Sequence, residues 1–232
     1  MCGINGLLAD PHRPAPAQAA LREQVQAMNA AVAHRGPDDE GVWTGPGVAL
    51  GFRRLAIVDL SPAGHQPMTN EDGTLWGVFN GEIYNHVALR DELIRKGHVF
   101  RSRCDAEVVL HAWECWGEDA LPRLNGMFAF ALWCTRTRRL VAVRDRLGVK
   151  PLMLHRQGGE LAFSSEVAGL RAVRALHRAD AAKLHDYLAY GYRTNDGRTM
   201  FQGVEELPPG HLLTWQDGRV NLRRWWALPP PP

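Results

Sequence analysis

The second residue of the chain could supply both a nucleophile and the base that activates it. Cys2 follows Met1, and removal of Met1, which a small second residue favours, would leave Cys2 with a free α-amine beside its thiol. The reference pKa of an α-amine, roughly 7.7–8.0, is close to that of a thiol, roughly 8.5, so the amine can accept the thiol proton. The simpler interpretation is a small buried hydrophobic residue, which is the usual role of a lone cysteine.

Arg54 interrupts an apolar strand face. A strand is predicted over residues 48–59, in which Val48, Leu50, Phe52 and Arg54 share parity, so Arg54 should point to the same side as three apolar side chains. An inward guanidinium needs an anion, because an unpaired buried charge is costly. A substrate carboxylate bound bidentately, a structural salt bridge, or a strand that twists out into water would each satisfy it.

Two short polar segments add further candidate chemistry. Asn80 and Gly81 follow a strand predicted over 75–79. An Asn-Gly pair is usually a turn, but it also sets an amide NH₂ beside an unhindered backbone N–H, which suits an oxyanion hole. Asp105 precedes an apolar-periodic run, so it is predicted to cap a helix, with a substrate ammonium as the alternative partner. The ten histidines show no pairing with carboxylates that indicates catalysis.

The apolar pattern predicts the frame that must position these residues. A strand is expected at Gly3–Leu8 and a helix over about 18–33. Two segments at 127–134 and 140–143 form a predicted hairpin that is apolar on both faces, and such strands must be covered on both faces. Antiparallel sheets packed together with helices outside, a layered α+β domain, satisfy this requirement. Further helices are predicted after Asn85, after Asp105, and at about 166–175 and 180–190.

Composition excludes several classes of protein. The formal net charge is +2 and 45% of residues are hydrophobic, which indicates a globular domain without a nucleic-acid or membrane-surface footprint. No apolar run approaches the ~20 residues of a membrane span, and no secretory signal is recognisable. Four cysteines without metal-ligand spacing predict free thiols in a reducing compartment, so the cytoplasm is the expected location. No glycine-rich nucleotide-binding motif occurs.

Several ordered segments together resemble a known family, the class II or N-terminal-nucleophile glutamine amidotransferases, and in particular the N-terminal glutaminase domain of glutamine-hydrolysing asparagine synthetases. Each segment is weak evidence alone, but their order over nearly the whole chain is specific. The matching segments are residues 1–4, 34–38, 54–60, 64–68, 80–85, 105–108, 125–130, 144–152, 165–166 and 207–211.

The resemblance implies a four-layer αββα N-terminal-nucleophile hydrolase sandwich of antiparallel sheets. It implies that Cys2 attacks the side-chain amide of glutamine while its own amine moves the proton, and that Asn80 and the Gly81 N–H form the oxyanion hole. Ammonia then leaves, and water hydrolyses the γ-glutamyl thioester to glutamate. The residues implied to bind substrate are Arg54 on the α-carboxylate, Glu82 and Asp105 on the α-ammonium side, and the backbone of Leu55, Ala56, Ile57 and Val58.

The resemblance also implies an organisation and partners. Residues 2–228 would form the glutaminase domain and 229–232 a Pro-rich end or the start of a linker. The family's ATP-pyrophosphatase synthetase domain is not recognisable in this sequence, so ATP and Mg²⁺ would belong to that missing half, and no metal or cofactor is expected for the glutaminase half. The expected function is hydrolysis of L-glutamine, with ammonia passed to a synthetase domain or chain that amidates aspartate. A homodimer is left open.

Two alternatives remain open on the sequence. The chain could serve another amidotransferase, in a sugar, surface-polysaccharide or antibiotic pathway, or it could be a catalytically silent docking module that keeps the fold. The sequence also departs from the family at Cys104-Asp105-Ala106-Glu107, where Ser-Asp-Thr-Glu is usual. This change is expected to lie outside the chemistry.

Overall fold

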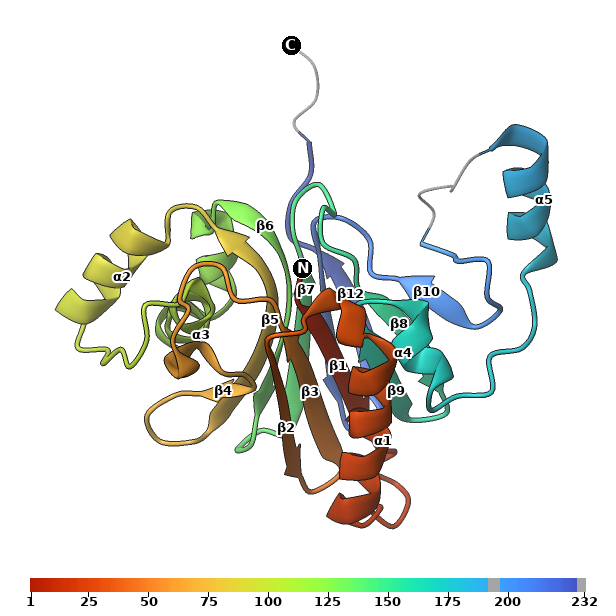
Figure 1. Ribbon diagram of the computed structural model, residues 1–232, viewed down its shortest axis with the longest axis horizontal. Coiled ribbons are helices and arrows are strands. Elements are labelled where there is room, and N and C mark those ends of the chain that lie inside the picture. Colours follow the sequence, from red (N-terminus) through yellow and green to blue (C-terminus); the bar gives the residue numbers. More distant parts are fainter. Residues whose placement is uncertain (192–196, 229–232) are drawn as a thin grey trace.

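The computed structural model describes residues 1–191 and 197–228, so the predicted linker at 229–232 lies outside the described residues. Two six-stranded sheets form the centre of the molecule, and every strand pair in both is antiparallel (Figure 1). In spatial order the first sheet contains β10 (Val204–Glu206), β8 (Met153–Gln157), β9 (Glu160–Ser164), β1 (Gly3–Leu8), β3 (Val48–Arg54) and β2 (Asp39–Gly45). The second contains β12 (Arg219–Arg224), β11 (His211–Gln216), β7 (Arg139–Arg144), β6 (Gly126–Cys134), β5 (Leu75–Ile83) and β4 (Met68–Thr69).

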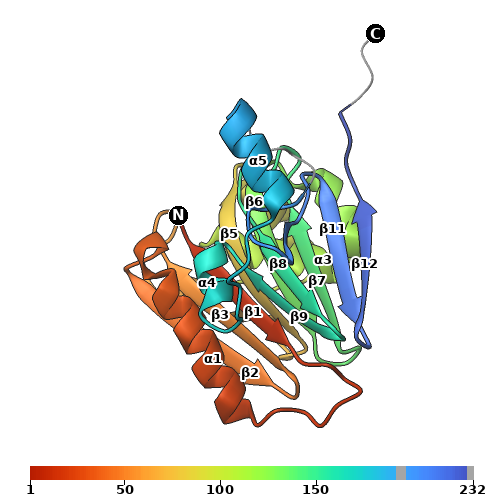
Figure 2. The same cartoon turned by 90° about the vertical axis from the view of Figure 1, so that its right-hand side faces the viewer.

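Helices cover the outer faces of the two sheets. Those that do so are α1 (Gln18–Ala31), α2 (His86–Arg95), α3 (Asp105–Trp116) and α4 (Val167–Arg171). The chain also forms α5 (Ala181–Tyr190) and 3-10 turns at Ala33–Arg35, Pro62–Gly64 and Gly117–Arg123. In Figures 1 and 2, α1 and α4 lie over the first sheet, while α2 and α3 lie on the side of the second. The order of layers is therefore helix, sheet, sheet, helix, and the predicted αββα sandwich is confirmed.

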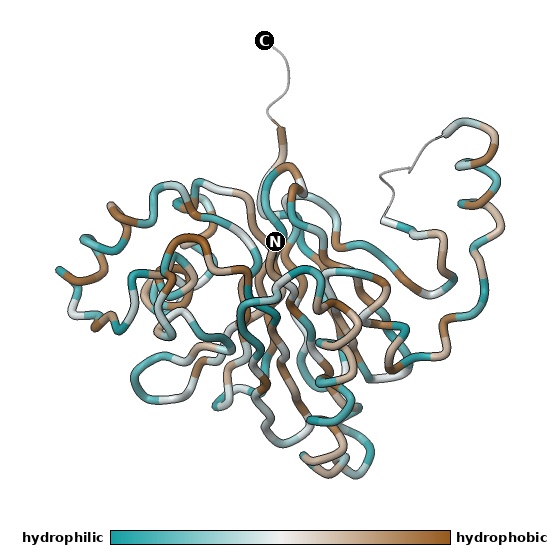
Figure 3. The backbone as a smooth tube through the Cα atoms, viewed as in Figure 1, coloured by the Kyte–Doolittle hydropathy of each residue, from teal (hydrophilic) through white to brown (hydrophobic). Residues whose placement is uncertain are grey.

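Three apolar cores separate these four layers. Ile4, Leu50 and Phe52 of the first sheet pack against Val78 and Ala131 of the second to form the middle core. A second core joins the outer face of β5 and β6 to α2 and α3, and a third joins β1 and β3 to α1 and α4. Both sheets are thus buried on both faces, which explains why their central strands are apolar throughout. Figure 3 shows apolar residues recurring along these strands.

Three predicted elements differ from the structure. The strand expected over 48–59 ends at Arg54, because the N–H groups of the next two residues bind a thiol and a carboxylate rather than a neighbouring strand. Asn80 and Gly81 are not a turn, since β5 continues to Ile83 and pairs with β6 along its whole length. Nor does Asp105 cap its helix: Cys104 occupies the N-cap position.

No helix among residues 1–191 and 197–228 is long and apolar enough to cross a membrane. α5 projects away from the body of the molecule (Figure 1) and leaves Leu188 and Tyr190 exposed.

Candidate active site

A single small cavity collects nearly all the residues that the sequence singles out. It has a volume of about 70 Å³ and lies where the start of β1 meets the far half of β5. Its walls combine two thiols, a guanidinium, an ammonium, three carboxyl groups and backbone amides. The lining residues are Met1, Cys2, Phe52, Arg54, Leu55, Ile57, Val58, Asp59, Gly64, Gln66, Phe79, Asn80, Gly81, Glu82, Cys104, Asp105, Met127 and Lys150.

Cys2 stands immediately before β1, which is an inner strand of its sheet. Its Sγ accepts a hydrogen bond from the Leu55 N–H at 3.4 Å. Burial raises the pKa of the Cys2 thiol, and the Leu55 hydrogen bond opposes that rise. The sulfur therefore remains protonated near neutral pH unless a base lies close to it.

The segment 34–38 holds both sides of this contact. Arg35 Nε donates to the carbonyl oxygen of Cys2 at 2.9 Å, and an Asp38 carboxylate oxygen accepts from the Ala56 N–H at 2.8 Å. Gly36 passes so close to β3 that a Cβ there would lie 2.5 Å from the backbone of Arg54. The segment thus fixes the thiol and the irregular loop after β3 relative to each other.

A second loop anchors the first residues of β1. The Ser165 Oγ accepts from the Ile4 N–H at 3.0 Å, and the Ser165 N–H donates to the Ile4 carbonyl oxygen at 2.9 Å. Glu166 forms a 2.7 Å ion pair with Arg35, whose side chain is buried. Ser165 and Glu166 therefore position Cys2 without lining the cavity.

Arg54 is a buried cation whose hydrogen bonds go to backbone oxygens. Its Nη1 donates to the carbonyl oxygen of Ser61 at 2.8 Å, and its Nη2 donates to the carbonyl oxygen of Asp59. Within residues 1–191 and 197–228 no carboxylate forms an ion pair with it. Gly64 makes room for the guanidinium, because a Cβ at this position would lie 2.0 Å from Nη2. A cation held this way at a cavity wall is suited to bind a carboxylate.

The edge of β5 presents backbone donors to the cavity. The Phe79 N–H donates to the Gln66 side-chain oxygen at 2.6 Å, and the Ile83 N–H donates to Asp105 Oδ2 at 2.9 Å. Because N–H groups alternate along a strand, the Gly81 N–H points to the same edge. β4 pairs with β5 only up to Gly77, so Gly81 lies beyond the neighbouring strand.

Asn80 adds a side-chain donor to this edge. The residue is 1% exposed, and its Nδ2 has no hydrogen-bond partner among the described residues. A buried amide donor without a partner costs free energy of about 1–3 kcal/mol, which an acceptor on a bound molecule would recover. The Asn80 Nδ2 and the Gly81 N–H are thus neighbouring donors in the wall of the cavity.

Asp105 and Cys104 form the acidic wall of the cavity. Burial raises the pKa of the Asp105 carboxyl, and the Ile83 hydrogen bond opposes the rise. Burial and the Asp105 charge raise the pKa of Cys104 to about 12, so its thiol stays protonated and donates to Asp105 Oδ1 at 3.6 Å. The departure at Cys104, expected to lie outside the chemistry, nevertheless places a thiol in the cavity wall.

Lys150 is the main site residue that the sequence reasoning missed. Its buried side chain lines the cavity, and Nζ lies 3.3 Å from the Met1 sulfur. Burial and the charge of Arg35 lower its pKa. The Asp145 carboxylate shapes the preceding loop by accepting from the N–H groups of Leu147, Val149 and Lys150. The segment 144–152, which contains Lys150, is one of those that resemble the family, but the resemblance alone gave this lysine no role.

One predicted pocket residue lies elsewhere. Ala56 is not among the lining residues, and its N–H binds Asp38 instead. Leu55, Ile57 and Val58 do line the cavity, although Ile57 is 65% exposed. Glu82 also lines it and is half-buried.

A family model described as a glutamine amidotransferase domain matches residues 1–226. The chain belongs to this family. The resemblance found in the sequence is therefore confirmed, and the enzymatic class it implied is that of the family.

Known relatives of this glutamine amidotransferase domain include two asparagine synthetases (glutamine-hydrolyzing) of Bacillus subtilis strain 168. Number 3 is 37% identical over 98% of this chain and 37% of its own length, and number 1 is 35% identical over 97% and 35%. The chain thus spans about a third of these two proteins and is homologous to their glutaminase part. A solved glutamine phosphoribosylpyrophosphate amidotransferase from B. subtilis shares the fold, with a TM-score of 0.70 at 19% identity, over 97% of this chain and 49% of that one.

The Gly64→Ala substitution tests the anion site of this amidotransferase domain. A methyl group 2.0 Å from Nη2 must displace the Arg54 guanidinium, and charged hydrogen bonds are worth about 1.5–3 kcal/mol. We expect the KM for glutamine to rise about tenfold or more in a glutaminase assay, with a smaller effect on kcat. The exposed neighbour Ala63→Ser is the control, and an unchanged KM in Gly64→Ala would remove the anion site from Arg54.

Proposed function

We propose that the chain hydrolyses L-glutamine to glutamate and ammonia through a thioester on Cys2. The observation that carries this proposal is the buried Asn80 amide, without a partner, in the same cavity as the Cys2 thiol. Thiolate attack on the γ-carboxamide places negative charge on the amide oxygen, and the Asn80 Nδ2 and Gly81 N–H stabilise it. Collapse releases ammonia, and water then cleaves the thioester.

The base in this scheme is the α-amine of Cys2 after removal of Met1. Burial lowers the pKa of the N-terminal amine of Met1, and the charges of Arg35 and Lys150 lower it further. Arg35 binds the Cys2 carbonyl oxygen itself, so the same cation stays beside the new terminus. A neighbouring positive charge keeps the amine unprotonated, and therefore able to accept the thiol proton and pass it to the leaving ammonia.

The substrate is fixed by its α-carbon. Arg54 binds the α-carboxylate, Asp105 and Glu82 bind the α-ammonium, and Leu55, Ile57 and Val58 close the sides of the pocket. Because both charged groups are held, only a side chain of the right length brings its carbonyl carbon to the sulfur. This selects glutamine over asparagine.

The released ammonia goes to an ATP-dependent synthetase domain or chain, with aspartate as the acceptor. The asparagine synthetases that resemble this chain support that acceptor. ATP and Mg²⁺ serve that partner rather than residues 2–228. A cytoplasmic setting is consistent with four unpaired cysteine thiols.

The test is ammonia release from glutamine, measured together with the intact mass of the protein. Chains that lack Met1 should release ammonia, and the Cys2→Ala variant should release none. Chains that retain Met1 should also be inactive, because their Cys2 nitrogen is an amide. The Cys115→Ala variant is the matched control, since this partly buried cysteine lies outside the cavity. Equal release by Cys2→Ala and the parent would refute the proposal.

The Asn80→Ala substitution should lower kcat about 100- to 1,000-fold, because loss of one oxyanion donor typically costs about 2.7–4 kcal/mol in the barrier. KM should change much less, since the donor acts on charge that develops after binding. The exposed Asn221→Ala on β12 is the control. Near-normal turnover in Asn80→Ala would exclude Asn80 from the oxyanion hole.

The raised pKa of Asp105 predicts an acidic limb in the pH profile of kcat/KM. Protonation removes the charge that binds the substrate ammonium, so kcat/KM should fall on acidification with an apparent pKa above the ordinary 3.8. The Asp105→Asn variant keeps an acceptor for Ile83, should raise KM about 10- to 100-fold, and should lose the limb. If Glu82→Gln loses it instead, the titrating group is Glu82.

A further inference from the structure

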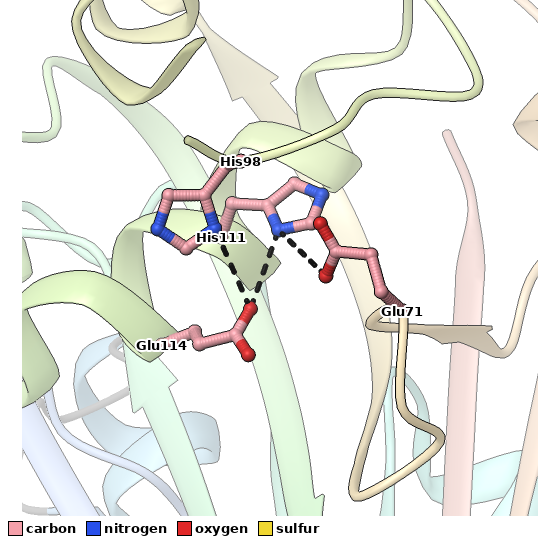
Figure 4. A group of neighbouring side chains, drawn as sticks. All are labelled: Glu71, His98, His111 and Glu114. Carbon is pink, nitrogen blue, oxygen red and sulfur yellow. Dashed lines mark hydrogen bonds and ion pairs between the residues drawn. The ribbon is translucent and has the colours of Figure 1, made fainter. Parts of the chain in front are cut away.

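A cluster of potential metal ligands lies outside the Cys2 cavity. Glu71 comes from the β4–β5 turn and His98 from the loop after α2, while His111 and Glu114 stand one turn apart on α3. Figure 4 shows the four side chains directed toward one another. Each offers one donor atom, and these atoms all lie within 4.8 Å of one another.

Three of the six distances between donor atoms approach the edge length of a tetrahedral zinc site. Zinc–ligand bonds of about 2.0–2.1 Å require donors roughly 3.3–3.5 Å apart in a regular tetrahedron. The His111 Nδ1 lies 3.4 Å from Glu114 Oε2 and 3.8 Å from Glu71 Oε2. The His98 Nδ1 lies 3.6 Å from the same Glu114 oxygen. A small contraction would bring these edges to the zinc distance.

The carboxylates are held by the oxygens that face away from the centre. Glu114 Oε1 accepts from the Asn70 Nδ2 at 2.9 Å, and Glu71 Oε1 accepts from the Val99 N–H at 3.0 Å. In both residues Oε2 is thereby left toward the histidines. Ordering of ligands by hydrogen bonds of this kind is typical of metal sites.

His111 is oriented in the same way. Its side chain is 2% exposed, its Nδ1 faces the cluster, and its Nε2 lies 3.8 Å from the carboxylate of Glu107. Glu107 in turn accepts from the N–H groups of Arg101 and Ser102. A carboxylate beside the second nitrogen of a metal-binding imidazole fixes its tautomer and raises its basicity.

We propose that Glu71, His98, His111 and Glu114 bind a structural Zn²⁺ ion. Two imidazole nitrogens and two carboxylate oxygens suit zinc among the common metals, and four protein ligands leave no position for a substrate. The ion would join three segments, including residues 98–104, which lead from α2 into Asp105. It would therefore brace one wall of the Cys2 cavity. The sequence-based expectation of no metal did not reveal this set, because its ligands come from three separate segments.

The competing arrangement is an ion-pair cluster around a protonated His111. Burial by itself would lower the pKa of His111, but Glu107, Glu71 and Glu114 raise it overall. The surrounding carboxylates thus favour a positive charge at the centre, and either a proton or a metal ion could supply it. Metal binding by the folded protein distinguishes the two.

The experiment uses the chain without a histidine tag, stripped with a chelator, and Zn²⁺ alone as the probe. The Cys2→Ala background removes the active-site thiol as a competing ligand. We expect one Zn²⁺ per chain by elemental analysis after dialysis, a thermal midpoint raised by a few degrees, and a four-coordinate Co²⁺ absorption spectrum after substitution. Absence of stoichiometric Zn²⁺ from the folded Cys2→Ala chain would overturn the site and leave the ion-pair cluster.

Variants locate the ion. In competition with a chromogenic chelator, His98→Ala and Glu114→Gln should each weaken Zn²⁺ binding at least tenfold, while their circular dichroism without metal matches the parent. The exposed His12→Ala and Glu23→Gln are the controls and should bind as the parent does. Equal affinity in all four would place the ion elsewhere and refute the proposal. No readout depends on glutamine hydrolysis, so the two proposals fail independently.

Discussion

The position of the Cys2 sulfur depends on the pairing of β1 between β3 and β9. An inner strand is held along both edges, so the residue at its start has a fixed place relative to both sheets. The N-terminus of a chain would otherwise fray. Ser165 and Arg35 extend this restraint to the first residues by binding the backbone of Ile4 and Cys2. Cys2, the proposed nucleophile, thus has the order of a core strand.

Around this fixed point, the buried charges of Arg54 and Asp145 bind backbone groups. Arg54 binds two carbonyl oxygens, and Asp145 accepts from a run of N–H groups. Burying either charge costs free energy, and its hydrogen bonds to the backbone offset that cost. The same bonds order a loop that has no regular hydrogen bonding of its own. The three loops that approach the cavity, after β3, after β7 and before α3, are all shaped in this way.

Much of the fold followed from the apolar pattern, because strands buried on both faces and helices buried on one give distinct periodicities. Cys2, Arg54 and Asn80 stand out from residue type and strand parity, and the ordered segments then imply their roles. The features that the sequence did not predict depend on contacts between residues far apart in the chain. β3 ends at Arg54 because the N–H groups of the next two residues bind Cys2 and Asp38. Lys150 reaches the cavity only through the loop around Asp145, and the role of Gly64 appears only once Arg54 is placed beside it.

The short β4 strand leaves the second half of the β5 edge without a neighbouring strand. β4 ends early, and the side chains of Gln66 and Asp105 take the places that a longer neighbour would fill along β5. Between them the Gly81 N–H forms the next rung of the ladder and faces the cavity. In the proposed mechanism the carbonyl of the substrate completes that rung, so the bound amino acid behaves as one residue of a missing strand. That donor belongs to the main chain, but its place still depends on the missing side chain, because a Cβ at Gly81 would lie 2.3 Å from the Met127 carbonyl oxygen.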